Sequence, residues 1–128
     1  MISTERILFS LQMAEESLQE VHLLFKDNKT RSLLNSLYNV FYYGMEAILL
    51  KQDIHCRSHS ELKKTFFEKV IRAGLLEKDS SHWENKIEDI FRVKEENEKG
   101  KKFTDEEVSG FIKRGEAFLK SVKKHLLV

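Results

Sequence analysis

Residues 33–48 carry apolar side chains over a wide arc of one predicted helix. Steps of three and four residues give two neighbouring stripes: Leu34, Tyr38, Phe41, Met45 and Ile48 on one, and Leu33, Leu37, Val40, Gly44 and Ala47 on the other. A helix that is apolar over so wide an arc has to be covered on most sides. The segment is therefore predicted to be the central helix of the fold, and its tyrosine hydroxyl groups need hydrogen-bond partners or water.

The rest of the chain also predicts helices. It contains no proline and only five glycines, which favours long uninterrupted helices. Apolar residues recur at alternating steps of four and three from Ile7 to Phe25, and a polar break over 26–29 precedes the central helix. We expect these two helices to pack as an antiparallel pair, with Asn28 or Thr30 capping the second.

Later helix boundaries are marked more clearly. The segments 58–61, 81–84 and 104–107 match the capping box, a hydroxyl group at the N-cap with a carboxylate three residues on. Gly74 and Gly100 stand where helices should stop, because glycine tolerates the left-handed conformation there. The apolar seam expected on the third helix is Leu62, Phe66, Val70 and Ala73. The sequence thus predicts an all-α protein, an up-and-down helical bundle of about five helices.

Length and composition restrict the class of protein. The 128 residues allow one domain, 1–128, with a core of its own. No apolar run approaches the roughly 20 residues that cross a bilayer, and the N-terminal segment lacks the pattern of a signal peptide. A single cysteine, Cys56, excludes an internal disulfide. We expect a soluble cytoplasmic protein.

Motifs for common catalytic or metal sites are missing. The chain has no glycine-rich phosphate loop, no His-Glu-x-x-His and no serine elbow, so no cofactor is expected. His55, Cys56 and His59 lie close together and could be proposed as metal ligands. A fourth ligand is missing, and a loop that leads into a helix cap explains the three residues better, so no metal site is expected.

One ordered set of residues resembles a known family. It comprises Ser36, Tyr38, Tyr42 and Tyr43 with the small residues Gly44 and Ala47, then Arg57, Ser58 and His59 opening a helix, then Arg92 late in the fourth helix. In this order the chain resembles the small stand-alone proteins of the HEPN (higher eukaryote and prokaryote nucleotide-binding) superfamily. The resemblance covers nearly the whole chain in helix order and number.

The resemblance implies a helical homodimer linked to nucleotides or RNA. Such proteins are often encoded beside a minimal nucleotidyltransferase, as in a toxin–antitoxin pair. Active members act as metal-independent ribonucleases through an arginine followed, four to six residues later, by a histidine. This chemistry is reasonable, because arginine clamps a phosphate and histidine transfers a proton near neutral pH.

The chain departs from this pattern after Arg92. Asn97 stands where the resemblance would place a histidine, with Glu96 before it. Asparagine cannot act as a general acid or base, and Glu96 lies at the spacing of an intrahelical ion partner for Arg92. The sequence therefore predicts a degraded or different active site.

The candidate ligand-binding residues are Arg92, Glu96, Asn97, His59, Tyr38, Tyr42 and Tyr43. We expect Arg92 to share one groove with His59 and a tyrosine. Each residue also has a structural interpretation: His59 as a solvent-facing residue of a first helical turn, Arg92 as an ordinary surface ion pair. Tyr42 and Tyr43 are sequence neighbours, so one is expected in the core and the other at a groove or partner subunit.

Three functions remain open. The favoured one is a binding module for nucleotide or RNA phosphate that acts with a minimal nucleotidyltransferase. The alternatives are a weak metal-independent endoribonuclease toxin that uses Arg92 and His59, and a structural dimerisation module. The formal net charge of +1 gives no case for strong nucleic-acid binding. The lysines of 99–102 could still form a modest basic patch with Lys120, Lys123 and Lys124.

Overall fold

The chain folds into helices, as expected. The computed structural model describes residues 3–76 and 81–127, and no strand is found among them. The helices are α1 (Thr4–Lys26), α2 (Thr30–Lys51), α3 (His59–Phe66), α4 (Ser81–Glu98) and α5 (Asp105–Leu126), with a π-helical turn η1 (Phe67–Ile71) directly after α3. The prediction of an all-α helical bundle is confirmed.

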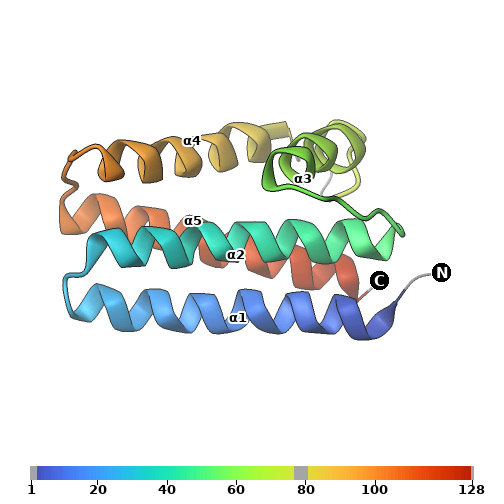
Figure 1. Ribbon diagram of the computed structural model, residues 1–128, viewed down its shortest axis with the longest axis horizontal. Coiled ribbons are helices and arrows are strands. Elements are labelled where there is room, and N and C mark those ends of the chain that lie inside the picture. Colours follow the sequence, from blue (N-terminus) through green and yellow to red (C-terminus); the bar gives the residue numbers. More distant parts are fainter. Residues whose placement is uncertain (1–2, 77–80, 128) are drawn as a thin grey trace.

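Four long helices run alongside one another, and α3 lies across them near the end of the bundle that holds both chain termini (Figure 1). α1 and α2 form the expected antiparallel pair. α2 and α5 run parallel, since Lys51 Nζ near the end of α2 donates to the carbonyl oxygen of His125 near the end of α5, at 2.9 Å. The up-and-down description thus applies to the long helices, and α3 departs from it.

α2 is the central helix. It contacts each of the other four α-helices, and both predicted stripes are buried except at Tyr38, which is half-buried. Gly44 and Gly115 allow α2 and α5 to approach closely. A Cβ atom at Gly44 would lie 2.8 Å from the ring of Phe118, and one at Gly115 would lie 2.5 Å from Leu37 Cδ1. The prediction of a helix covered on most sides is confirmed.

The predicted helix ends are largely correct. Thr104 and Glu107 form the complete capping box, and the Ser58 hydroxyl accepts the Glu61 N–H bond at 3.1 Å. Gly74 and Gly100 have φ of 68° and 105°, as a left-handed helix end requires. The side chain of the third predicted cap, Ser81, lies outside the described residues.

Two local predictions need correction. Lys29, not Asn28 or Thr30, is the N-cap of α2, and Asn28 instead ends α1 with a φ of 55°. The N–H groups of Asn28 and Lys29 donate to the carbonyls of Phe25 and Leu24, the pattern of a Schellman motif. Asparagine suits this position because it tolerates the left-handed conformation better than most residues.

The expected seam of the third helix ends early. Leu62, Phe66 and Val70 are buried, but Ala73 is exposed. The π-helical turn η1 explains the difference, because its wider turn shifts the buried side to Phe67, Val70 and Ile71. The expected seam rested on α-helical spacing that continues without interruption as far as Ala73.

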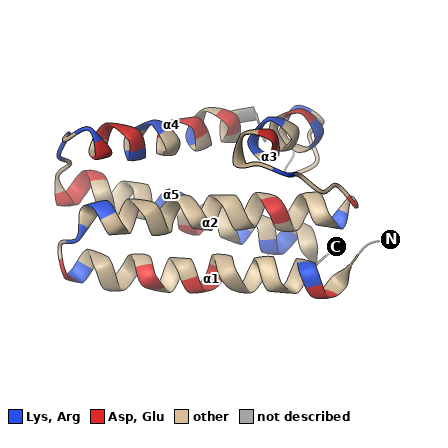
Figure 2. Cartoon of the chain, in the orientation of Figure 1, with Lys and Arg blue, Asp and Glu red and all other residues tan. Residues whose placement is uncertain are grey.

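The lysine clusters do not form one patch. Lys101 and Lys102 precede α5, whereas Lys120, Lys123 and Lys124 lie in its second half. α5 has 22 residues and is therefore about 33 Å long. The two groups of lysines lie toward opposite ends of the bundle (Figure 2), so the shared patch that the sequence left open does not form and the clusters are separate.

The close approach of α2 and α5 gives a stability prediction. Gly44→Ala should destabilise the fold by roughly 1–3 kcal/mol, because the added methyl group overpacks against the buried ring of Phe118. The higher helix propensity of alanine offsets up to about 1 kcal/mol of this loss. Gly110→Ala in α5 is the matched control, since nothing lies within 4 Å of the added Cβ. It should be neutral or stabilising. Urea denaturation of both variants measures the difference, and equal effects would contradict the packing argument.

Candidate functional site

Aromatic side chains from three helices meet at one place on the surface. Tyr38 and Tyr42 lie one turn apart on α2, with ring centroids separated by 6.5 Å. The His59 ring, at the start of α3, lies 4.1 Å from that of Tyr42, and Phe91 of α4 lies 4.8 Å from Tyr38. We call this site the aromatic groove. It has a volume of about 460 Å³ and is lined by Tyr38, His59, Ser60, Lys63, Phe91, Lys94, Glu95 and Glu98.

A hydrogen bond joins Tyr38 and His59 in the groove. The hydroxyl oxygen of Tyr38 lies 2.8 Å from Nδ1 of His59. The Ser58 cap fixes the backbone of this first turn, and the Glu61 carboxylate accepts the Arg57 N–H bond at 3.1 Å. Burial raises the pKa of the Tyr38 hydroxyl, so this group keeps its proton at neutral pH and can donate to an unprotonated Nδ1. The capped turn therefore holds His59 against α2.

Two lysines lie over the ring faces of the groove. Lys94 Nζ is 5.2 Å from the ring centroid of Tyr38, and Lys63 Nζ is 5.4 Å from that of Phe91. Lys94 pairs with Glu98, and Lys63 Nζ lies 3.2 Å from an oxygen of Glu88. Two lysines and two glutamates line the groove, so their formal charges cancel. The site offers flat apolar surfaces with paired charges at the rim.

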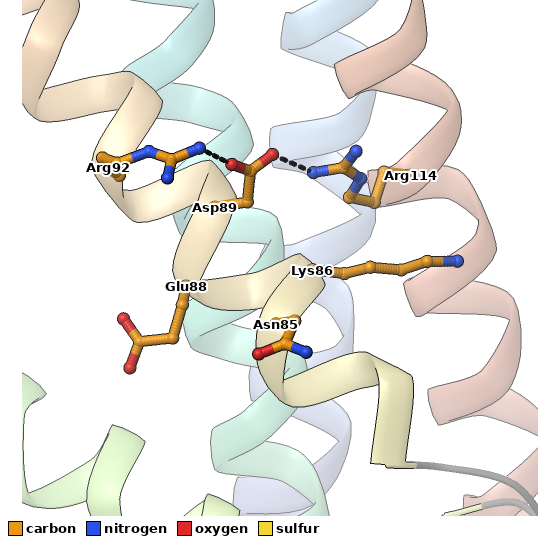
Figure 3. A pocket seen from close by; sticks show the side chains of 6 residues that line it. All are labelled: Asn85, Lys86, Glu88, Asp89, Arg92 and Arg114. Atoms are coloured by element: carbon orange, nitrogen blue, oxygen red, sulfur yellow. Dashed lines mark hydrogen bonds and ion pairs between the residues drawn. The ribbon is translucent and has the colours of Figure 1, made fainter.

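Arg92 lies outside this groove. Its Nη2 donates to Asp89 Oδ1, while Arg114 Nη1 of α5 donates to Asp89 Oδ2 at 2.7 Å (Figure 3). These residues belong to a second depression, the α4/α5 hollow, with a volume of about 580 Å³ and lined by Asn85, Lys86, Glu88, Asp89, Arg92 and Arg114.

The expectation that Arg92 and His59 share one groove is therefore corrected. Successive residues on an α-helix point about 100° apart. Because Phe91 faces the ring of Tyr38, Arg92 is turned away from it, toward the exposed side of α4. Arg92 also lies 3.6 Å from Glu96 through Nε, which is the intrahelical pairing that its spacing indicates.

The remaining candidates are engaged elsewhere. Asn97 Nδ2 donates to the carbonyl oxygen of Lys101 at 2.9 Å, and Glu96 pairs with Lys101 Nζ at 3.1 Å. Both contacts stabilise the turn between α4 and α5. Tyr43 is half-buried against a small apolar cluster of Ala14, Val40 and Leu119, although its ring meets that of Tyr42 edge-on at 5.1 Å. Of the seven candidates, the structure brings together Tyr38, Tyr42 and His59.

The sequence did not indicate all the residues of the two sites. Phe91, Lys63, Lys94, Asp89 and Arg114 were not among the candidates. Phe91 could have been noticed, because it lies beside the core positions of α4 and is aromatic. The others depend on which helices face each other, and the spacing within one helix does not contain that information.

The His55, Cys56 and His59 cluster has other partners. Arg6 Nη1 lies 3.0 Å from Nδ1 of His55, and Asp53 Oδ1 lies 3.1 Å from its Nε2. Within 3–76 and 81–127, no group of three His, Cys, Asp or Glu side chains is arranged to hold a metal ion. The described helices also include none that is long and apolar enough to cross a membrane.

Comparisons with known proteins give two likenesses. No family model matches the chain. It is similar to a UPF0332 protein of Thermotoga maritima, with 26% identity over 113 residues that span 87% of this chain and 83% of that protein. It is also similar to a protein of Methanocaldococcus jannaschii named "Putative toxin MJ0142", with 23% identity over 117 residues, 91% of this chain and 79% of that protein. Both likenesses are consistent with a small HEPN-like protein, although neither name states a HEPN domain.

The environment of the tyrosines predicts their titration. Burial raises the pKa of Tyr38, and burial followed by the negative charge of Glu46 raises that of Tyr42. A raised pKa means that the neutral hydroxyl persists above the ordinary value of 10.0. The absorbance of phenolate should therefore show a late component, and Tyr38→Phe should remove about half of it.

Circular dichroism at the same pH values shows whether the protein is still folded when the late component titrates. If Tyr38→Phe leaves the late component at full amplitude, the assignment to Tyr38 is wrong.

Proposed function

We propose that the protein is a HEPN-like binding module for a nucleotide or a short segment of RNA, and that the aromatic groove takes the base. The observation that carries the proposal is the meeting of Tyr38, His59 and Phe91, from three helices, beside two lysines. Single-stranded nucleic acids are commonly bound by aromatic rings that stack on bases and by cations near the backbone.

The expected affinity follows from the same groove. Stacking a base on an aromatic side chain contributes roughly 1–3 kcal/mol. The lysines contribute little more, because a phosphate has to replace Glu98 beside Lys94 and Glu88 beside Lys63. We therefore expect the nucleotide to bind with modest affinity and with a weak dependence on salt, in keeping with the chain's formal net charge of +1.

A toxin-like role is part of the proposal. The similarity to the archaeal protein, which is named as a toxin, supports it. The resemblance to the HEPN superfamily adds a minimal nucleotidyltransferase as the partner in a toxin–antitoxin-like pair. Co-purification of this chain with a nucleotidyltransferase encoded beside it is the test, and separate elution of the two proteins would count against the pair.

We also propose a homodimer. Leu8, Phe9 and Leu23 of α1 are 58%, 59% and 61% exposed, which is apolar surface that a second copy could cover. The family resemblance instead favours the end of α4 as the interface. Light scattering tests the dimer itself, and a monomer at tens of micromolar, a concentration typical of moderate affinities, would contradict it.

An endoribonuclease is the second candidate. It would use Arg92 as a phosphate clamp and His59 for proton transfer. In one copy these residues line different depressions, so a second copy would have to bring its Arg92 to this His59. A purely structural dimerisation module is the third candidate, and it leaves the aromatic groove without a role.

Binding of AMP and of a short oligoadenylate tests the proposal. Titration calorimetry with a chelator present should detect binding to the unaltered protein. Phe91→Ala should weaken it about five- to 150-fold, as loss of a stacking contact predicts, and Lys94→Gln should weaken it about two- to threefold, because the lysine contributes less. Lys101→Gln is a matched control, because Lys101 Nζ lies 5.3 Å from the ring of Phe103 in the same kind of contact outside the groove.

Two results would count against the binding module. Equal losses for Lys94→Gln and Lys101→Gln would show that the groove is not the site. Rapid cleavage of RNA by the unaltered protein in the presence of the chelator would favour the endoribonuclease. In that case His59→Ala and Arg92→Ala, mixed as separate copies, would test whether two subunits share one active site.

A further inference from the structure

A single carboxylate holds two arginines in the α4/α5 hollow. Asp89 of α4 accepts one N–H bond from Arg92 and one from Arg114, and it lies between the two guanidinium groups (Figure 3). The side chain of Arg114 is 26% exposed and that of Arg92 is 65% exposed. The cluster therefore lies at the surface but is anchored on two helices.

The hollow has more positive than negative charge. Lys86, Arg92 and Arg114 line it, and Asp89 is the acid at its centre. Glu88 also lines it, but its side chain points away from Asp89 and pairs with Lys63 at 3.2 Å (Figure 3). Among the described residues Lys86 forms no ion pair, and its Nζ lies 5.2 Å from the ring centroid of Trp83. Three cationic and two acidic side chains thus line the hollow, and Glu96 lies 3.6 Å from Nε of Arg92 at its edge.

The hydrogen-bonding capacity of these arginines is also incompletely used. A guanidinium group has five N–H donors, and Asp89 accepts one bond from each arginine. Arg72 offers a contrast in the same protein. Its Nε and Nη2 donate to both oxygens of Glu84, at 3.0 and 3.1 Å, which is a closed bidentate pair. The arginines of the hollow can still bind an anion that has several oxygens.

We propose that the α4/α5 hollow is a binding site for an oxyanion of the phosphate class, and that Asp89 occupies the position of the ligand when none is bound. The ligand would bridge Arg92 and Arg114, with Lys86 as a third cation. The volume of about 580 Å³ is many times the ~30 Å³ that one water molecule takes up in the liquid, so the hollow has room for a ligand much larger than water. This site goes beyond the base-binding role proposed for the aromatic groove and does not depend on it.

Asp89 would then compete with the anion for the two arginines. Its negative charge repels an incoming anion and occupies the donors that the anion needs. Asp89→Asn removes the charge while keeping the shape of the side chain. The two guanidinium groups then repel each other until an anion binds between them. Loss of an acidic side chain from this hollow should therefore strengthen binding of an anion, whereas loss of a basic side chain should weaken it.

Titration calorimetry with inorganic pyrophosphate, at fixed low ionic strength, tests the site. Asp89→Asn should tighten binding about tenfold, and Arg114→Gln should weaken it by about the same factor, as expected for charge-assisted hydrogen bonds. Arg72→Gln is the matched control, since it removes an arginine from a closed pair, and it should stay within about twofold of the unaltered protein. Lys86→Gln should weaken binding without loss of an ion pair, which separates binding from folding.

Amide NMR spectra of the same samples show whether each variant is folded and whether α4 and α5 respond to pyrophosphate. ADP serves as a second probe. If ADP binds with the same affinity as pyrophosphate, the diphosphate alone is recognised. If ADP binds more tightly than pyrophosphate and Lys94→Gln abolishes that difference, the nucleotide also reaches the aromatic groove. Lys94→Gln should leave pyrophosphate binding unchanged, so this site and the proposed function can fail separately.

Three results would overturn the proposal. The first is no binding of pyrophosphate by either the unaltered protein or Asp89→Asn. The second is weaker binding after Asp89→Asn, which would make Asp89 a support of the site and not a competitor. The third is an equal loss from Arg72→Gln and Arg114→Gln, which would indicate a general effect of net charge.

Discussion

The close packing of α2 against its neighbours determines where this protein can have a site. α2 lies in contact with α1, α3, α4 and α5, and most of its apolar surface is buried. Tyr38 and Tyr42 are half-buried at the edge that α3 and α4 cover incompletely. The aromatic groove is therefore a place where apolar side chains packed on the core reach the surface. Its rings are held by the packing of the bundle, so a flat ligand would meet a surface that is already arranged.

The two sides of α4 carry different chemical groups. One side of α4 carries Phe91 and Lys94 toward α2 and α3, and the other carries Asp89 toward Arg114 of α5. Arg92 belongs with the second side, although the family resemblance grouped it with His59. In a single copy Arg92 and His59, the two residues that the endoribonuclease candidate would use, thus line different depressions. The proposed binding of a base needs only the side with Phe91 and Lys94. A ribonuclease that uses Arg92 and His59 needs a second copy to bring the two residues together.

Local patterns predicted what depends on local physics. The two stripes of α2, the capping box at Thr104 and the left-handed ends at Gly74 and Gly100 each follow from a few neighbouring residues, and the structure confirms them. The π-helical turn after α3 and the contact between Asp89 and Arg114 were not predicted. The Asp89–Arg114 contact depends on which sides of α4 and α5 face each other, and it joins residues 25 positions apart in the chain.

The central claim is that the aromatic groove binds a base. Intermolecular nuclear Overhauser effects between AMP and the labelled protein test it most directly, because they report contacts between individual protons. The account predicts contacts from the adenine H2 and H8 protons to the rings of Tyr38 and Phe91. Binding of AMP without any such contact, or with contacts to Phe103 and Phe111 instead, would contradict it.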